Sequence, residues 1–217
     1  MVKVCTISTS KGGTGKTTLA VALVDFWRRS GKKVAVLDTD PNQSITRWIG
    51  KTEEFADIAS ATTSNELDVV ETVQNLAEDA DIIVIDTAGF GNQAMIYAVG
   101  VADLVLIPVL ADEASVFEAI KMRRIVENAS ALSRRQVPFR TVLNRARNTL
   151  VSRHTRRNLE QQGLNPVNVS IGDRSIFQEA SYHGASVTAL DKRSKAVREI
   201  RRLANELAPL LEDDNAA

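Results

Sequence analysis

Apolar and polar positions divide the chain into alternating strand-like and helix-like segments. Several apolar runs are continuous, which is typical of strands covered on both faces of a parallel sheet. The predicted strands are 2–8, 33–38, 81–87, 103–109, 139–144 and 166–170. Between them, apolar residues recur with helical spacing, and the predicted helices are 16–29, 42–49, 66–78, 91–100, 112–133, 151–162 and 191–211. This alternation predicts an α/β fold in which a mostly parallel β-sheet is wrapped by helices.

Length and composition favour a single domain. The chain has 217 residues, 44% of them hydrophobic, and we expect one domain over 1–211 followed by a disordered acidic tail, 212–217. No apolar run has the length of a membrane span, and the N-terminus lacks the layout of a signal peptide. The single cysteine, Cys5, alternates with apolar neighbours and is interpreted as a core residue. These features favour a cytoplasmic protein.

The net charge of zero conceals an uneven distribution of charge. Residues 1–110 contain 9 basic and 14 acidic residues, whereas residues 111–217 contain 18 and 13. Within 121–157, 11 basic residues accompany a single acid, Glu127. Overall neutrality therefore does not exclude an anionic partner.

The stretch STSKGGTGKTT, residues 8–18, lies between the first predicted strand and the first predicted helix. A phosphate-binding loop, G-x-x-x-x-G-K-[ST], occupies this place in nucleotide-binding folds, and here Ser10 replaces its first glycine. We expect Lys16 to reach the β- and γ-phosphates and the Thr17 hydroxyl to bind Mg²⁺. The glycines allow backbone N–H groups to face phosphate oxygens at a helix N-terminus. The predicted nucleotide-binding residues of this loop are Gly12, Gly13, Thr14, Gly15, Lys16, Thr17 and Thr18.

Three aspartates follow two further predicted strands. Asp38 and Asp40 close the second strand, and Asp86 ends the apolar strand IIVID. Carboxylates at these strand ends can hold Mg²⁺-bound water or orient the water that attacks the γ-phosphate. For Asp40, capping of the following helix is the structural alternative. Gly89 in DTAG can offer a backbone N–H to the γ-phosphate, which predicts a switch segment over 87–93.

Together, the stretches KGGTGKTT, VLDTDPNQS and IIVIDTAG resemble the motifs of the ParA/MinD family of deviant-Walker ATPases. The stretches LIPV, VLNR and FQEASYHGASV extend the resemblance along nearly the whole chain. The chain is most similar to small ParA-like partition ATPases without an N-terminal DNA-binding domain. The resemblance implies a P-loop NTPase fold of the deviant-Walker type, ATP and Mg²⁺ as cofactors, and slow ATP hydrolysis.

The resemblance also implies a homodimer that forms on ATP and encloses it between two subunits. In such a dimer Lys11 reaches across the interface to the partner's phosphates and neutralises charge during hydrolysis, as an arginine finger does in other NTPases. Asp40 positions the hydrolytic water. The implied site residues are Lys11, Lys16 and Asp40 for catalysis, Thr17, Asp38 and Asp86 for the metal, and Asn144 for adenine.

Three branches of the family differ in what they bind. ParA-like proteins bind nonspecific double-stranded DNA as ATP dimers and are released by a ParB-like adaptor that stimulates hydrolysis. MinD-like proteins bind membrane through a C-terminal amphipathic helix, and nitrogenase iron-protein relatives hold a cluster through paired cysteines. Because the chain has a single cysteine, Cys5, it cannot supply the paired cysteines of the third branch. The last predicted helix ends in acidic residues and has no Trp or Phe, so packing onto the domain explains its apolar stripe better than membrane binding does.

The basic segment favours the first branch. Arg153 and Arg157 are four residues apart and share a helix face, where they can neutralise DNA phosphates without reading bases. A solvated helix face is the alternative. In the turn IGDR, Asp173 departs from the family pattern and leaves open whether Arg174 contributes. The predicted DNA-binding residues are Arg153, Arg156, Arg157 and Arg174.

We therefore expect a cytoplasmic, nucleoid-associated ATPase that segregates or positions a plasmid, a chromosome region or a protein cargo. An adaptor protein stimulates its hydrolysis, and no membrane contact is expected. The alternatives are a MinD-like membrane-associated positioning ATPase, a metabolic ATP-dependent enzyme of the synthetase type, and a nucleotide switch that does not hydrolyse ATP.

Overall fold

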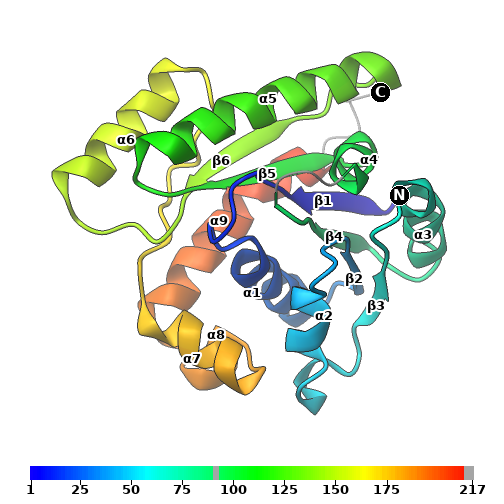
Figure 1. Ribbon diagram of the computed structural model, residues 1–217. Coiled ribbons are helices and arrows are strands. Elements are labelled where there is room, and N and C mark those ends of the chain that lie inside the picture. The colour runs from blue at the N-terminus through cyan, green and yellow to red at the C-terminus, as the bar shows by residue number, and fades with distance from the viewer. Residues whose placement is uncertain (90–92, 213–217) are drawn as a thin grey trace.

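The computed structural model describes residues 1–89 and 93–212, which contain one six-stranded sheet. All strand pairs in it are parallel, and the strand order is β3-β2-β4-β1-β5-β6 (Figure 1). The strands are β1 (Lys3–Ile7), β2 (Val34–Asp38), β3 (Ala59–Thr62), β4 (Ile82–Asp86), β5 (Leu104–Val109) and β6 (Phe139–Leu143). The carboxyl ends of all six strands therefore lie along one edge of the sheet.

Helices cover both faces of this sheet, as the alternating pattern predicts. On one face lie α1 (Lys16–Arg29), α2 (Ser44–Ile49), α7 (Ser175–His183), α8 (Val187–Leu190) and α9 (Lys195–Glu212) (Figure 1). On the other lie α3 (Val69–Leu76), α4 (Ala94–Gly100), α5 (Glu113–Ser133) and α6 (Leu150–Gln161). Two short 3-10 helices, η1 (Glu53–Phe55) and η2 (Glu66–Asp68), complete the described elements. The α/β fold class is confirmed.

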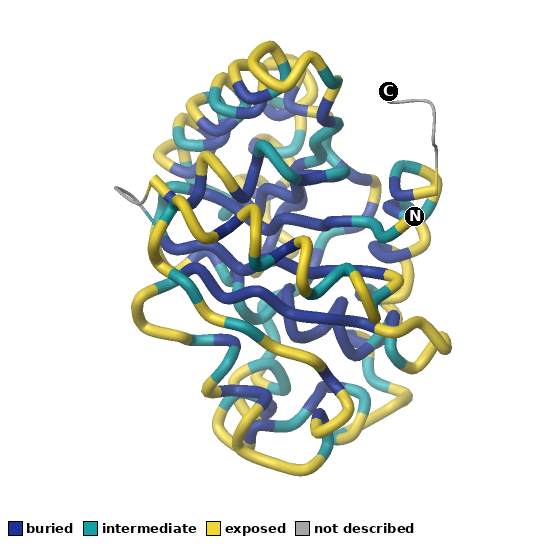
Figure 2. Tube along the Cα trace, turned by 90° about the vertical axis from the view of Figure 1, so that its right-hand side faces the viewer, coloured by how far each residue is buried: buried dark blue, intermediate teal, exposed yellow. Residues whose placement is uncertain are grey.

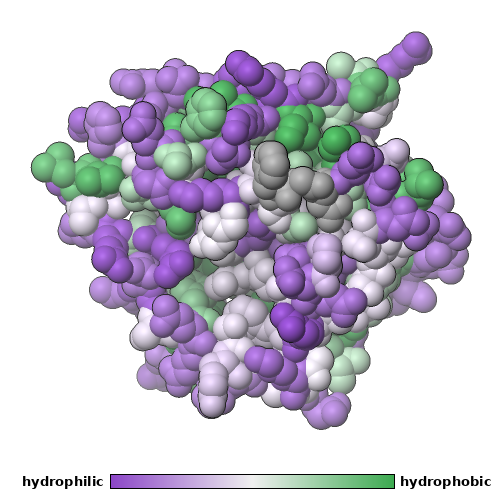
Figure 3. All heavy atoms as spheres, viewed as in Figure 1, coloured by the Kyte–Doolittle hydropathy of each residue, from purple (hydrophilic) through white to green (hydrophobic). Residues whose placement is uncertain are grey.

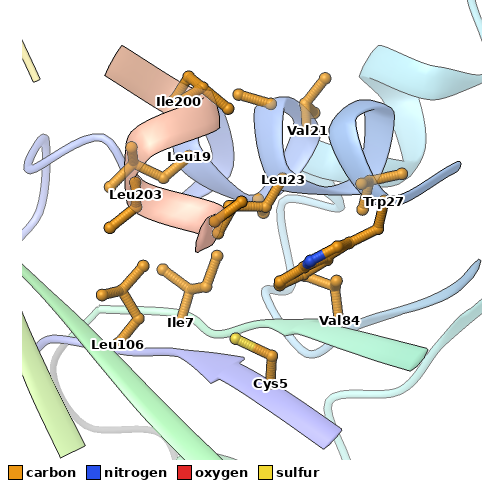
Figure 4. Close-up of a cluster of buried hydrophobic side chains, with 14 of the residues drawn as sticks. Cys5, Ile7, Leu19, Val21, Leu23, Trp27, Val84, Leu106, Ile200 and Leu203 are labelled. Atoms are coloured by element: carbon orange, nitrogen blue, oxygen red, sulfur yellow. The ribbon is translucent and has the colours of Figure 1, made fainter. Parts of the chain in front are cut away.

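The largest apolar cluster lies between the sheet and the pair α1 and α9. Leu23 from α1 and Leu203 from α9 point toward Ile7 and Leu106 on the strands (Figure 4). Residues of β2, β4 and β5 are buried throughout, so the strands form the dark centre of Figure 2. Cys5 lies in this cluster with none of its surface exposed, and burial raises the pKa of its thiol to about 12. It is a core residue, as expected.

The predicted strand 166–170 does not form. Residues 165–171 run beside β6, with Val167 donating to the Thr141 carbonyl at 2.9 Å and Ile171 donating to the Leu143 carbonyl at 2.9 Å, but the only bridge to β6 among the described residues is an isolated one, between Thr141 and Pro166. Pro166 has no N–H to donate. The amides of Asn168 and Val169 bind the Glu206 carboxylate of α9 at 2.6 and 3.1 Å, so they are not available to a strand partner.

Other differences concern short or polar elements. The edge strand β3 has the sequence ASAT and carries no apolar run, so the pattern of apolar residues did not predict it. The helix predicted from residue 42 begins at Ser44, which leaves Pro41 outside the helix. The helices α7 and α8 were not predicted, and the predicted helix 91–100 begins at residues outside the described part of the chain. Of the predicted tail, 213–217 lies outside it as well, whereas Glu212 ends α9.

The apolar stripe of α9 packs onto the domain. Ile200, Leu203, Leu207 and Leu211 recur at helical spacing and are all buried. This confirms the packing interpretation of that stripe. Among residues 1–89 and 93–212, no helix combines the length and the apolar character needed to cross a bilayer.

Replacing Leu203 by alanine tests this packing. Leu203 is fully buried between α9 and the sheet, so Leu203→Ala should lower the free energy of unfolding by about 3 kcal/mol, because it removes apolar contacts and leaves a cavity. Urea unfolding followed by circular dichroism measures this change. Asn205→Ala, at an exposed position of the same helix, is the control and should change stability by less than about 0.5 kcal/mol. Equal effects of the two substitutions would contradict the packing of α9.

Candidate nucleotide-binding site

A cleft of about 810 Å³ opens at the carboxyl edge of the sheet, next to the loop that joins β1 to α1. Its size suits a nucleotide. It is lined by the loop residues Gly12, Gly13, Gly15, Lys16, Thr17 and Thr18. The rest of its lining includes Asp40, Gly89, Asn144, Arg145, Gly172, Asp173, Arg174 and Phe177. The cleft therefore brings together residues that follow β1, β2, β4 and β6.

Gly15 fixes the transition from the loop to α1. It is the residue before the helix and has a φ of 88°, in the left-handed region that favours glycine. A Cβ at this position would lie 2.4 Å from Nδ2 of Asn144, which donates to the Thr14 carbonyl at 2.7 Å. The loop after β6 is thereby held against the phosphate-binding loop. Asn144, predicted to contact adenine, lies on the wall of the cleft.

Thr17 and Asp86 join α1 to the end of β4. The Thr17 hydroxyl donates to Asp86 Oδ2 at 2.7 Å, while the buried Oδ1 has no hydrogen-bond partner among the described residues. A buried carboxylate oxygen without a donor is destabilising, and a hydrated cation would satisfy it. The described residues contain no group of three or more His, Cys, Asp or Glu side chains that could hold a metal alone. The pair thus fits Mg²⁺ that takes its remaining ligands from phosphates and water.

Asp38 lies beside Asp86 because the two residues are register partners on β2 and β4. Its carboxylate accepts backbone N–H groups of Asp40 at 3.0 Å and Thr46 at 3.2 Å. Burial raises the pKa of Asp38 in spite of these bonds. Asp38 therefore shapes the segment between β2 and α2, and its predicted contact with the metal site remains a prediction.

Asp40 lies on the wall of the cleft. Its Oδ1 accepts from the backbone N–H of Asn42 at 2.9 Å, which forms a tight turn before α2. The first residue of α2 comes four residues after Asp40, so Asp40 is not the cap of that helix. Its carboxylate remains partly exposed to the cleft, where it can orient a water molecule.

Lys16 is directed into the site. The side chain is buried, and its Nζ donates to the Lys11 carbonyl at 3.5 Å. Burial lowers the pKa of Lys16, and the nearby carboxylates of Asp86 and Asp40 oppose this shift. A phosphate group would provide the missing anionic partner.

Lys11 is directed away from its own cleft. Its Nζ contacts both carboxylate oxygens of Asp112, at 2.8 and 3.0 Å, and the Ser115 hydroxyl at 2.9 Å. Burial acts to raise the pKa of Asp112, but the contacts with Lys11 and the hydrogen bonds from Ser115 together lower it. With 30% of its side chain exposed, Lys11 is accessible at the rim of the site. The two lysines of one loop thus have different environments.

Gly89 lies close to the phosphate-binding loop. A Cβ built on it would be 3.5 Å from the Ser10 carbonyl and 3.8 Å from the Gly12 nitrogen. Gly89 lies within the predicted switch segment 87–93, of which residues 90–92 lie outside the described part of the chain.

The four arginines predicted to bind DNA have different surroundings. Arg153 and Arg157 are exposed on α6. Arg156 donates to the carbonyls of Asn168 and Val167 at 3.0 and 2.9 Å, so it holds the segment beside β6. Arg174 lines the nucleotide cleft. DNA binding by these residues remains a prediction.

Sequence reasoning missed several residues that hold this site. Asp112 and Ser115 receive Lys11, and Glu118 accepts a hydrogen bond from Ser10, the residue in place of the first glycine. All three residues follow β5 along the chain. The predicted carboxyl end of β5 lies at the same edge of the sheet as the phosphate-binding loop, and this is the signal that could have indicated them. Glu199 binds Arg174 from α9. No motif marks that contact, because it depends on how α9 returns to the sheet.

Comparison with known proteins agrees with this geometry. A sequence model described as the CobQ/CobB/MinD/ParA nucleotide binding domain matches residues 5–187. Protein ParA of Rhizobium radiobacter is 35% identical over 105 residues, which cover 48% of this chain and 47% of that protein. The chain spans about half the length of the first curated relatives that it matches, 47% to 56%.

Two solved structures share the fold. Apo McdA of Cyanothece has a TM-score of 0.82 at 19% identity, covering 95% of this chain and 100% of that chain. MinD of Pyrococcus horikoshii, complexed with Mg-ADP, has a TM-score of 0.81 at 16% identity, with 98% of both chains covered. The fold is therefore that of the MinD/ParA P-loop NTPases.

The buried Asp86 predicts a pH dependence of stability in the nucleotide-free protein. Burial raises the pKa of Asp86 to about 7, whereas a carboxyl in the unfolded chain loses its proton near pH 4. Between these values the folded state binds more protons, so stability falls as the pH rises through this window. The side chain introduced by Asp86→Asn carries no charge at any pH. The free energy of unfolding of this variant, relative to that of the wild type, should therefore increase from pH 5 to pH 8.

Urea midpoints of both proteins at the two pH values measure this difference. Asp79→Asn, which changes an exposed carboxyl, is the control and should show no such gain. A constant difference between Asp86→Asn and the wild type at pH 5 and pH 8 would show that Asp86 is not a protonated buried group.

Proposed function

This chain belongs to the CobQ/CobB/MinD/ParA nucleotide-binding family, and from that premise we propose that it is a ParA-like ATPase that works as an ATP-dependent homodimer. ATP is enclosed between the two subunits in this proposal. The dimer binds DNA without sequence preference, and a partner protein stimulates hydrolysis to release it. The cycle would segregate or position a cargo in the cytoplasm, on the nucleoid.

The different environments of Lys16 and Lys11 carry this proposal. Lys16 is buried in the cleft and suffices to bind the phosphates of its own nucleotide. Lys11 belongs to the same loop, yet its ammonium group lies at the rim, on Asp112 and Ser115. Because Lys16 already serves the phosphates of its own subunit, Lys11 at the rim can bind the phosphates in the cleft of another subunit. If Lys11 left Asp112 and bound the phosphates of the partner's nucleotide, dimerisation would depend on nucleotide binding.

Exposed apolar side chains near this rim support a protein contact. Phe117 on α5 is 57% exposed and Ile96 on α4 is 47% exposed, and the two helices pack on each other. Figure 3 shows green apolar atoms over α4 and α5 on a mainly purple surface. Asp112, which holds Lys11, is the N-cap of α5. A second subunit placed to receive Lys11 would cover part of this apolar surface.

The remaining site residues suit phosphoryl transfer to water. Mg²⁺, when bound, would neutralise charge on the β- and γ-phosphates. The hydroxyl of Thr17 and the carboxylate of Asp86 are the groups that would hold it. Lys16 would bind the same phosphates, and Asp40 would orient the attacking water from the wall of the cleft.

Two exposed basic surfaces support nonspecific DNA as the partner. Arg153 and Arg157 form the first, on the outer face of α6. The second is on α9 and consists of Lys195, Arg198, Arg201 and Arg202, all of them exposed. None of these four forms an ion pair with another residue in 1–89 or 93–212. Cations without acidic partners are suited to DNA phosphates.

The segment 167–169 connects these two surfaces. Its carbonyls accept hydrogen bonds from Arg156 of α6, and its amides bind Glu206 of α9. The two helices therefore lie on either side of one segment. A dimer would present both surfaces twice, which increases the number of phosphate contacts and the salt dependence of binding.

Relatives with related names support a role in partition or positioning. The matched relative from Rhizobium radiobacter is named ParA, and one of full-length similarity in Bacillus subtilis is named sporulation initiation inhibitor protein Soj. A plasmid, a chromosome region or a protein assembly would be the cargo. A ParB-like protein or its equivalent would be the stimulating partner.

Replacement of Lys11 tests the proposed role across the interface. Lys11→Ala should leave ATP binding by the isolated subunit within about twofold of wild type, because Lys16 remains, but should reduce ATP hydrolysis by about tenfold or more. Equilibrium dialysis and phosphate release measure the two quantities. Lys32→Ala, an exposed lysine in the turn before β2, is the control. Normal hydrolysis by Lys11→Ala protein would rule out the role.

Charge reversal on each helix tests the DNA surfaces. Arg153→Glu with Arg157→Glu, and separately Arg198→Glu with Arg202→Glu, should each weaken DNA binding by about tenfold and reduce its salt dependence. Filter binding to unrelated DNA sequences at several salt concentrations measures both effects. Lys32→Glu with Lys33→Glu changes the charge equally at the opposite edge of the sheet and is the control. DNA binding unaffected by both helix variants would refute the DNA proposal.

A further inference from the structure

The turn of residues 171–174 forms part of the wall of the nucleotide cleft. It precedes α7 and lies beside α9 (Figure 1). Gly172 and Arg174 both line the cleft. Only 31% of the Arg174 side chain is exposed. This position differs from that of Arg153 and Arg157, which project from α6 into solvent.

The guanidinium of Arg174 is held in a fixed orientation by Glu199 of α9. Its Nε donates to Glu199 Oε2 at 3.1 Å, and its Nη2 donates to Oε1. Glu199 Oε2 also accepts the backbone N–H of Gly172 at 3.0 Å. A guanidinium bound through two nitrogens by one carboxylate has a defined plane. The contact fixes both the turn and the side chain.

Gly172 packs against one flat face of this guanidinium. A Cβ at Gly172 would lie 2.8, 2.9 and 3.0 Å from Nη2, Cζ and Nε of Arg174. A point nearly equidistant from these three atoms lies over the plane of the group and not at its edge. Any side chain at this position would displace the guanidinium. The present orientation of the guanidinium therefore depends on glycine at this position.

We infer that the opposite face of Arg174 stacks on the base of the bound nucleotide. The inference rests on the nucleotide-binding part of the proposed function. A nucleotide whose phosphates are bound by Gly13 and Lys16 must rest its base on another part of the wall of the same cleft. Asn144 contacts the loop, the following Ala146 is bridged to Gly172, and Arg174 and Phe177 continue this wall. Guanidinium groups stack on aromatic faces, and a base is a flat aromatic ligand.

The contacts of Arg174 argue against its predicted role as a DNA-phosphate ligand. A bidentate phosphate contact uses two parallel N–H groups of an arginine, and Glu199 already occupies the Nε and Nη2 edge, which leaves only the Nη1 and Nη2 edge for a phosphate. The carboxylate also neutralises the charge that a phosphate would seek. Stacking uses the face of the guanidinium, which these hydrogen bonds leave unchanged. Arg174 is therefore a nucleotide-binding residue, and DNA contacts belong to α6 and α9.

Calorimetric titration with two ligands tests this inference. Arg174→Ala should weaken binding of Mg-ADP by about tenfold and leave binding of Mg-pyrophosphate unchanged, because pyrophosphate has no base. Arg174→Lys should behave like Arg174→Ala, since lysine keeps the charge without the planar face. Gly172→Ala retains Arg174 but displaces it and should give the same loss for ADP. Arg124→Ala, an exposed arginine on α5 outside the cleft, is the control and should leave both affinities unchanged.

Three results would overturn the inference. They are an unchanged ADP affinity in Arg174→Ala, an equal loss for ADP and pyrophosphate, and full recovery in Arg174→Lys. Measurement of DNA binding by Arg174→Ala protein at saturating ATP tests the alternative role of Arg174 as a DNA-phosphate ligand. Reduced DNA binding with normal ADP affinity would assign Arg174 to DNA. If the wild type binds neither ADP nor pyrophosphate, the proposed function itself fails, which is a different outcome from any of these.

Discussion

The position of β1 between β4 and β5 is the constraint on which the rest of the structure depends. The loop after β1 is flanked by the residues that follow its two neighbours. Thr17 binds Asp86 at the end of β4, and Lys11 binds Asp112 after β5. Asn144, after β6, reaches the same loop from one strand farther away. Because the sheet is parallel, all of these groups meet at one edge. The strand order therefore brings residues of separate sequence motifs together in one site.

Much of this arrangement could be predicted from the sequence because its elements carry local signals. The continuous apolar runs identified five of the six strands, and the glycines and lysines identified the loop. Asp38 and Asp86 were correctly placed at strand ends. The element bounds agree within a few residues where the apolar pattern is long, as in α1 and α5.

The remaining features depend on contacts between distant parts of the chain. The strand predicted at 166–170 failed because Glu206, about forty residues away, binds its amides. The partners of Lys11 and Arg174 are carboxylates on α5 and α9, and no local pattern distinguishes Asp112 or Glu199 from other surface acids. The edge strand β3 was missed because it is short and polar. Charge counts alone grouped Arg156 with Arg153, although one holds a backbone segment and the other is exposed.

These contacts give two parts of the cleft wall different surroundings. The phosphate-binding loop supplies Lys16 to the wall, whereas Lys11 of the same loop is held by Asp112. The turn that contains Arg174 is held by Glu199 of α9, and the exposed residues of α9 include Arg198 and Arg202. A change at the nucleotide could thus reach the basic face of α9 through one carboxylate. Binding at either place would then affect the other, because such coupling is reciprocal.

The central claim is that this site is completed by a second copy of the chain through Lys11. Sedimentation velocity in Mg-ADP and in a non-hydrolysable Mg-ATP analogue tests it directly. If Lys11 completes the site of a second copy, the wild type should be a monomer in ADP and a dimer in the analogue, and Lys11→Ala protein should be a monomer in the analogue. A wild-type monomer under both conditions, or a Lys11→Ala dimer as stable as the wild-type dimer, would contradict it.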